Sequence, residues 1–157
     1  MSAAQLVARF MARKLTCATA ESCTGGLVAA AITAIPGASS MFTHGFVTYA
    51  NEAKTQMLGV PATMLAEHGA VSEPVARAMA EGARARAGSD YAISTTGIAG
   101  PEGGSPDKPV GTVWFGLAGP KGTTSYHHIF QGDREAIRAQ AVRFILAQLE
   151  QQGDVHE

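Results

Sequence analysis

The 157-residue sequence has few of the features that hold small secreted proteins together or bind metals. It contains two cysteines, Cys17 and Cys23, which lie six positions apart and belong to no Cys-x-x-Cys or Cys/His pattern. A disulfide framework uses more cysteines, and a structural zinc site uses four ligands at characteristic spacings. The sequence therefore predicts neither a disulfide framework nor a bound metal.

A surplus of positive charge is also missing. Twelve Lys and Arg residues stand against thirteen Asp and Glu residues, and the formal net charge is −1. Nucleic-acid-binding proteins usually carry a clustered basic patch, whereas the basic residues here are spread along the chain. We expect no nucleic-acid partner, and we expect any anionic ligand to be small.

Long hydrophobic segments are absent as well. No apolar run approaches the ~20 residues of a membrane-spanning helix. The first residues predict an amphipathic helix with Leu6, Val7, Phe10 and Met11 on one side, without the apolar core and cleavage site of a signal peptide. We therefore expect a cytoplasmic protein with no membrane partner and, at this length, a single domain over residues 1–157.

The most informative segment is Ala-Glu-Ser-Cys-Thr-Gly-Gly at 20–26, where a strand pattern over 15–20 gives way to a helix pattern over 24–35. A Gly-rich turn at a helix start leaves backbone N–H groups free to bind a phosphate or an oxyanion. Ser22 lies where a nucleophile would lie beside such donors. A serine before a helix is more commonly an N-cap, and the segment alone leaves both interpretations open.

Periodicity and turn residues predict the other elements. Asn51 is a candidate cap for the third helix, Ser72 for the fifth and Asp133 for the last, whose apolar residues repeat every four positions. The expected helices cover 3–14, 24–35, 51–58, 61–68, 72–87 and the segment after 133. The expected strands cover 15–20, 46–50, 91–95, 110–117 and 123–130, with a hairpin turn at 119–122.

Helices alternate with strands early in the chain, and a hairpin closes the series. This order predicts an α/β fold, a three-layer α/β/α sandwich on a mixed β-sheet. Ligands in such folds collect beyond the carboxyl ends of the strands, where Ser22, Tyr49, Lys54 and Thr96 are expected. The long Gly-rich segment 96–109 leaves the same edge, so we interpret it as a lid or binding loop.

Six ordered motifs make the chain resemble the CinA carboxy-terminal domain family, which includes the nicotinamide-nucleotide amidohydrolases. They are AESCTGG at 20–26, GFVTYANEAK at 45–54, GAVSE at 69–73, TGIAGP at 96–101, KPVGTV at 108–113 and GDR at 132–134. The resemblance implies hydrolysis of the carboxamide of nicotinamide mononucleotide, without a cofactor. The amino-terminal domain of the longer family members is missing from the sequence.

The resemblance also implies roles for individual residues. Ser22 matches the nucleophile, Lys54 and Tyr49 match the groups that activate it, and Arg134 is expected to meet the substrate phosphate. Further substrate contacts are expected from Thr24, Gly25, Gly26, Thr96 and Gly97. Taken singly, a lysine such as Lys54 on a short helix is more often a solvated surface residue, and Glu21 could orient Lys54 or pair with a surface cation.

Two other functions stay open at this point. The chain could be a non-catalytic nucleotide-binding or competence-related module, or an amidase for another small phosphorylated amide. We also expect a homo-oligomer, most simply a dimer, because Met41, Phe42, Met64 and Leu65 add apolar residues to a chain that already has enough core.

The absence of a metal-ligand pattern generates a first prediction. A chelator such as EDTA should leave the amidohydrolase activity unchanged, because no cluster of His, Cys, Asp and Glu has ligand spacing. The rate of ammonia release before and after dialysis against chelator checks it. Activity that disappears and returns with one added metal would contradict a metal-free serine mechanism.

Overall fold

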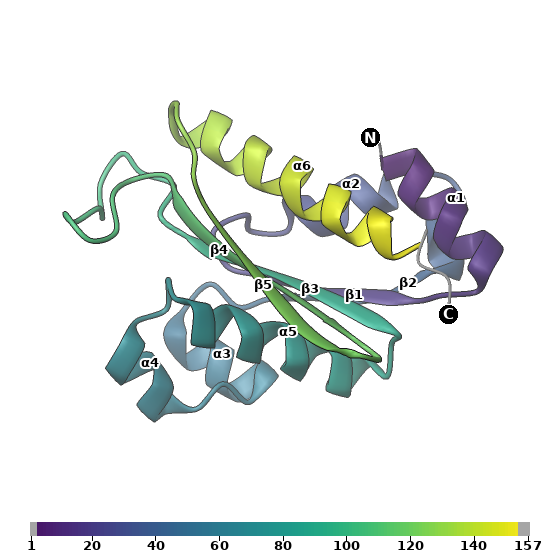
Figure 1. Cartoon of the computed structure of the whole chain (residues 1–157), viewed down its shortest axis with the longest axis horizontal. Coiled ribbons are helices and arrows are strands. Elements are labelled where there is room, and N and C mark those ends of the chain that lie inside the picture. Colours follow the sequence, from purple (N-terminus) through teal and green to yellow (C-terminus); the bar gives the residue numbers. More distant parts are fainter. Residues whose placement is uncertain (1–2, 154–157) are drawn as a thin grey trace.

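The computed structural model describes residues 3–153, which form one α/β domain (Figure 1). The helices are α1 (Ala3–Arg13), α2 (Leu27–Thr33), α3 (Asn51–Leu58), α4 (Ala62–His68), α5 (Glu73–Ala87) and α6 (Arg134–Gln152), with a short 3-10 helix at Ala38–Ser40. The strands are β1 (Cys17–Glu21), β2 (Phe42–Val47), β3 (Tyr91–Gly97), β4 (Thr112–Gly119) and β5 (Gly122–Ile129). None of these helices is long and apolar enough to cross a membrane.

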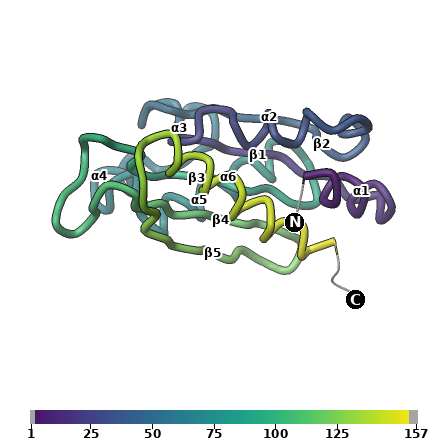
Figure 2. Tube along the Cα trace, turned by 90° about the horizontal axis from the view of Figure 1, so that it is seen from above, coloured from purple at the N-terminus to yellow at the C-terminus, as the bar shows by residue number. Residues whose placement is uncertain are grey.

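The five strands form one mixed sheet in the order β2-β1-β3-β4-β5 (Figure 2). β1 pairs in parallel with both β2 and β3, whereas β4 and β5 are antiparallel additions. The carboxyl ends of β1, β2 and β3 therefore meet at one edge of the sheet. This edge is where the candidate functional residues follow the strands, and the predicted mixed sheet is confirmed.

Helices cover both faces of the sheet, as predicted for a three-layer sandwich. α1, α2 and α6 lie on one face, and α3, α4 and α5 lie on the other (Figure 1). Strand alternation divides the core accordingly: Cys17 and Ile93 pack in the cluster with α1, α2 and α6, whereas Ala18 and Ala92 pack in the cluster with α5. Both faces of the central strands are thus buried.

α5 approaches the sheet closely because the facing side chains are small. A methyl group at Gly116 in β4 would lie 2.4 Å from the carbonyl oxygen of Ala76 in α5, so only glycine fits there. The Ser94 hydroxyl of β3 donates to the same oxygen at 2.6 Å. α5 in turn packs against α3, where a methyl group at Gly82 would lie 2.0 Å from the carbonyl oxygen of Leu58.

Several predicted boundaries and caps are wrong. The second strand covers Phe42–Val47 instead of 46–50, because its exposed edge residues do not alternate and its pairing with β1 sets its position. α2 begins at Leu27, later than expected. The N-cap of α3 is Ala50, not Asn51, and the Ser72 hydroxyl donates back to the carbonyl of Gly69 instead of capping α5.

The four apolar residues expected to be buried between subunits belong largely to the core of this chain. Met41 is fully buried and Leu65 nearly so. Phe42 and Met64 are partly buried against the two core clusters. The reason given for a dimer therefore fails for these residues, and the homo-oligomer stays a prediction.

The contact of α5 with α3 generates a second prediction. Gly82→Ala should lower the free energy of unfolding by about 1–3 kcal/mol, because the added methyl group overlaps the backbone of Leu58. Helix propensity alone would raise it by about 1 kcal/mol, so the sign is decisive. Urea unfolding followed by circular dichroism measures the change.

Ala85→Gly is the matched control, since Ala85 is exposed on the same helix. It should lose about 1 kcal/mol through helix propensity alone. A Gly82→Ala protein more stable than the wild type would show that α3 and α5 can separate at no cost.

Candidate active site

A cavity of about 250 Å³ opens where β1, β2 and β3 end. It is lined by residues from five separate segments: Ser22, Cys23, Tyr49, Asn51, Lys54, Ala70, Val71, Thr96, Gly97, Ala99 and Arg134. Six of the residues predicted from the sequence meet here: Ser22, Tyr49, Lys54, Thr96, Gly97 and Arg134. The predicted convergence at the sheet edge is therefore confirmed.

Ser22 and Lys54 are in direct contact at the base of this cavity. Ser22 follows the last residue of β1, and its amide donates to the carbonyl of Thr95 in β3 at 3.0 Å. Lys54 extends from the middle of α3, and its Nζ lies 3.0 Å from the Ser22 Oγ. Lys54 is 1% exposed, so it is not a solvated surface lysine.

The Lys54 amine is surrounded by oxygen atoms that carry no charge. Besides the Ser22 hydroxyl, its Nζ donates to the backbone carbonyls of Thr48 at 2.7 Å and Tyr49 at 3.3 Å. No carboxylate of residues 3–153 forms an ion pair with it. Burial therefore lowers the pKa of Lys54, since desolvation disfavours the ammonium form.

Cys23 adds little to the charge of this site. A thiolate there would raise the pKa of Lys54, but burial raises the pKa of Cys23 itself to about 12. The thiol is therefore neutral near neutral pH. Although Cys23 lines the cavity beside Ser22, it is a poor nucleophile in this state.

Glu21 caps α2, so both sequence-based interpretations of this residue are wrong. Its buried carboxylate accepts hydrogen bonds from the amides of Gly26, Val28 and Ala29 at 3.2, 2.9 and 3.0 Å, and from the hydroxyl of Thr24. Within the described residues it forms no hydrogen bond with Lys54 and no ion pair with a cation. Because Glu21 takes these donors, the start of α2 is not the open anion site expected from the sequence, and Ser22 is not its cap.

The structure does not bring Thr24, Gly25 and Gly26 into the cavity lining. Thr24 is fully buried, and its hydroxyl lies between Glu21 and the Thr95 hydroxyl. The Gly25 amide donates to the carbonyl of Ser22, and the Gly26 amide donates to Glu21. These residues shape the turn that carries Ser22.

Tyr49 and Arg134 form the mouth of the cavity. The Tyr49 ring is 61% exposed, and its hydroxyl accepts a hydrogen bond from the Arg134 guanidinium at 3.2 Å. A second guanidinium nitrogen donates to the carbonyl of Gly100 in the loop 98–111 at 2.8 Å. Arg134 is the first residue of α6, after the Asp133 cap, whose carboxylate accepts from the Ala136 amide as predicted. It therefore joins three segments at the entrance.

Another wall of the cavity is formed by β3 and by the loop that precedes α5. The Thr96 hydroxyl donates to the carbonyl of Ala70 at 2.9 Å. A methyl group at Gly97 would lie 2.7 Å from a methyl group of Val113 and 2.8 Å from the carbonyl of Thr112, so glycine is required there. The Lys108 ammonium of the long loop donates to the carbonyl of His68 at the end of α4. The loop is thus anchored on both sides of the cavity, and its action as a lid stays a prediction.

Three residues with a place in this site escaped the sequence analysis. Cys23 and Asn51 line the cavity, and Arg138 contacts the turn that carries Ser22. Arg138 lies one helical turn after Arg134, so the i, i+4 spacing was the available signal. Among residues 3–153, no group of three or more His, Cys, Asp and Glu side chains could hold a metal.

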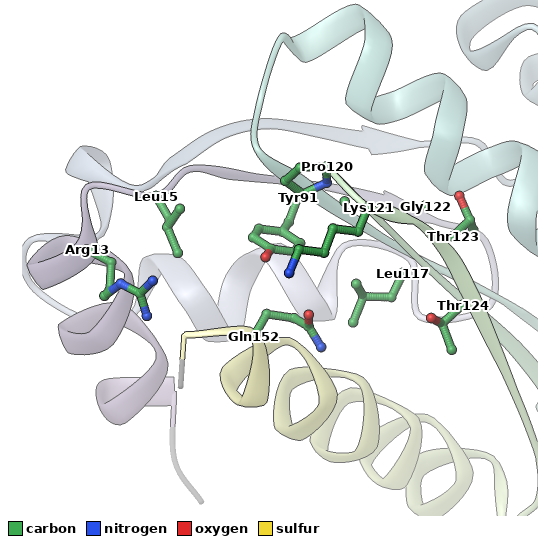
Figure 3. Close-up of a pocket in the computed structure, with 11 residues that line it drawn as sticks. Arg13, Leu15, Tyr91, Leu117, Pro120, Lys121, Gly122, Thr123, Thr124 and Gln152 are labelled. Carbon is green, nitrogen blue, oxygen red and sulfur yellow. The ribbon is translucent and has the colours of Figure 1, made fainter. Parts of the chain in front are cut away.

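A larger cavity of about 720 Å³ lies at the opposite edge of the sheet, near the amino ends of β1 and β3 (Figure 3). Arg13, Tyr91, Lys121 and Gln152 are among its lining residues. The guanidinium of Arg13 binds the carbonyl of Gly153 beside it. This cavity contains no paired nucleophile and base, so size alone does not identify the reactive site.

Comparisons with known proteins identify the family of this chain. Residues 1–152 match the family described as the CinA C-terminal domain. The chain belongs to the CinA C-terminal domain family. Solved structures of the CinA superfamily share its fold: one from Klebsiella pneumoniae has a TM-score of 0.93 at 41% identity, covering 97% of this chain and 95% of that chain. A competence/damage inducible protein from Agrobacterium tumefaciens has a TM-score of 0.89 at 44% identity, covering 94% and 90%.

Relatives of this CinA C-terminal domain occur in two lengths. Proteins from Shigella flexneri and Escherichia coli, named nicotinamide-nucleotide amidohydrolase PncC, are 57% identical over 142 residues, which cover 90% of this chain and 86% of theirs. A CinA-like protein from Anaeromyxobacter is 57% identical over 136 residues, 87% of this chain but 33% of its own length. The chain thus spans about a third of the longer relatives.

Proposed function

We propose that this protein hydrolyses the carboxamide of nicotinamide mononucleotide to nicotinate mononucleotide and ammonia, with Ser22 as the nucleophile. The observation that carries the proposal is the 3.0 Å contact between the Ser22 hydroxyl and the buried amine of Lys54. The likeness to nicotinamide-nucleotide amidohydrolases over nearly their full length supports the choice of substrate.

The surroundings of Lys54 favour its action as the base. A neutral amine has two N–H groups and one lone pair. The carbonyls of Thr48 and Tyr49 can only accept, so they take the two N–H groups and leave the lone pair for the Ser22 hydroxyl. Desolvation lowers the pKa of Lys54, which raises the fraction of neutral amine near working pH.

The reaction then proceeds in two balanced halves. Lys54 takes the hydroxyl proton as the Ser22 oxygen attacks the carboxamide carbon, and the resulting ammonium returns that proton to the leaving nitrogen, which departs as ammonia. Water attacks the acyl-serine, gives one proton to Lys54 and releases the carboxylic acid. Lys54 then protonates the Ser22 oxygen, which restores the starting state.

The oxyanion of each tetrahedral intermediate needs hydrogen-bond donors. In the turn after Ser22, the amides of Gly25, Gly26 and Leu27 already donate hydrogen bonds within the protein. Within residues 3–153, the Cys23 amide donates to no other residue, and Cys23 lines the cavity. We assign oxyanion stabilisation to this amide, next to the nucleophile in the chain.

The cavity dimensions support a substrate orientation with the phosphate outward. About 250 Å³ is less than the ~300–1,000 Å³ of sites that enclose drug-sized ligands. The cavity therefore encloses the carboxamide and the ring, and the rest of the nucleotide lies at the mouth. Arg134 and the Tyr49 hydroxyl lie there, so we propose that the guanidinium binds the phosphate and that Tyr49 contacts substrate instead of acting as the base.

Another small phosphorylated amide is the second candidate substrate, because Ser22 and Lys54 act on the amide and not on the ring. A non-catalytic interaction module is less favoured, since it would not need a desolvated lysine against a serine. Ammonia release from amides with and without the phosphate separates these functions. No release from any of them would leave only the module.

Ser22→Ala tests the nucleophile. Ammonia release from nicotinamide mononucleotide, followed with a coupled ammonia assay, should fall to background. The free energy of unfolding should change by less than about 1 kcal/mol, because Glu21 and not Ser22 caps α2. A variant that unfolds easily but keeps its specific activity would show that Ser22 is structural.

The pH dependence tests Lys54. Only the neutral amine can accept the proton, so kcat/KM should rise with pH and level off above an apparent pKa lower than the ordinary ~10.4 of lysine. Lys54→Met keeps the length of the side chain but cannot accept a proton. It should lose about 10²–10⁴-fold in kcat and also lose this pH dependence.

Lys54→Arg separates charge from proton transfer, because arginine stays protonated. It should be as inactive as Lys54→Met if both remain folded by circular dichroism. Near-normal turnover in Lys54→Arg would show that Lys54 supplies only charge, which would make Tyr49 the candidate base.

A further inference from the structure

We propose that Glu21 and Arg138 are positioning residues that hold the serine turn, residues 22–26, one through its hydrogen-bond donors and the other through its acceptors, so that the Ser22 hydroxyl stays against Lys54. The inference rests on the proposed function, because it concerns the nucleophile of that reaction. Neither side chain lines the cavity, so both act through the turn.

Glu21 holds the hydrogen-bond donors of the turn and of the first turn of α2. One carboxylate oxygen accepts from Thr24 Oγ, the Gly26 amide and the Val28 amide, and the other accepts from the Ala29 amide. An ordinary N-cap reaches two or three residues forward, whereas Glu21 reaches five to eight. The bonds therefore close a loop around Ser22.

Arg138 holds two backbone acceptors of the same turn. Its Nε donates to the carbonyl of Cys23 at 3.1 Å, and a terminal nitrogen donates to the carbonyl of Thr24 at 3.3 Å. Cys23 also carries the amide assigned to the oxyanion. Holding these two carbonyls restrains the backbone on the carboxyl side of that amide.

The remaining contacts explain why both residues are needed. The sheet holds the backbone before Ser22. The Ser22 amide donates to the Thr95 carbonyl, and the Thr48 amide donates to the Glu21 carbonyl. Within the turn, the Gly25 amide donates to the Ser22 carbonyl, and the Thr24 hydroxyl shares a hydrogen bond with the Thr95 hydroxyl of β3. These contacts leave the carbonyl of Cys23 and the start of α2 to the two charged side chains, so releasing either one leaves the strand in place but lets Ser22 and the oxyanion donor move relative to Lys54.

Arg138→Met is the first test, because it removes the donors and keeps most of the side-chain volume. We expect kcat to fall about 10–100-fold, as for a reacting group displaced by about 1 Å, with KM within about twofold. Arg138→Lys can donate to one carbonyl and should recover part of the loss. Arg143→Met removes the same charge from an exposed position of α6 and should keep the wild-type kcat.

Glu21→Gln is the second test. The glutamine side chain still accepts hydrogen bonds at its one oxygen, but its NH₂ group faces the Ala29 amide, and two donors cannot bond to each other. We therefore expect kcat to fall again with little change in KM. Glu150→Gln is the matched control, since Glu150 is also buried but pairs with Arg9, away from the cavity. It should lose stability and keep the kcat of the folded protein.

A fluorophosphonate measures the reactivity of Ser22 without any nucleotide substrate. The Ser22 oxygen bonds to phosphorus, fluoride leaves and Lys54 takes the proton, so the labelling rate reports the position of the nucleophile. We expect it to fall with kcat in Arg138→Met and Glu21→Gln, at temperatures where all variants are folded. Ser22→Ala, which should not be labelled, shows that Ser22 is the labelled residue.

The two readouts separate this inference from the proposed function. Wild-type protein that is labelled at Ser22, slows in both variants and releases no ammonia from nicotinamide mononucleotide would support the positioning role and contradict the proposed substrate. Ammonia release with wild-type kcat and labelling rates in both variants would overturn the positioning role alone. Absence of Ser22 labelling in the wild type would overturn it as well.

Discussion

The contact between a buried amine and a serine hydroxyl is the constraint on which this site depends. A lysine ammonium is costly to bury without a counter-ion, and no carboxylate among residues 3–153 pairs with Lys54. The fold meets that cost with backbone carbonyls from the end of β2 and with the Ser22 hydroxyl. Burial lowers the pKa of Lys54, and Ser22 is the hydroxyl in contact with it, as the proposed mechanism requires.

The acidic residue next to Ser22 has a different task. Glu21 faces the start of α2, so its negative charge is stabilised by backbone amides and by the helix dipole instead of by Lys54. An ion pair between Glu21 and Lys54 would stabilise the ammonium form of Lys54 and remove the base of the proposed mechanism. The separation of Glu21 from Lys54 is therefore as important to the proposed chemistry as the proximity of Lys54 to Ser22.

Most of the fold could be predicted from local patterns, and the errors have identifiable causes. The starts of α5, at Glu73, and of the last helix were predicted correctly. Proline, acidic residues in the first turn and the Asp133 cap mark a helix start through neighbours in the sequence alone. β2 was misplaced because an edge strand need not alternate, and its pairing with β1 decides its limits. Asn51 and Ser72 were expected to cap their helices. The N-cap of α3 is Ala50 instead, and the Ser72 hydroxyl donates to the Gly69 carbonyl, neither of which the local sequence reveals.

For the site, the sequence by itself determined which chemical groups are available and that they follow strand ends, since parallel strands bring their carboxyl ends to one edge. Only the tertiary structure decided what each group does. Burial is a property of packing, so it alone turns Lys54 from a surface lysine into a desolvated amine in contact with Ser22. The hydrogen bonds of Glu21 to α2 and of Arg138 to the serine turn are likewise decided by the fold, because the packing of the elements determines which backbone groups each side chain can contact.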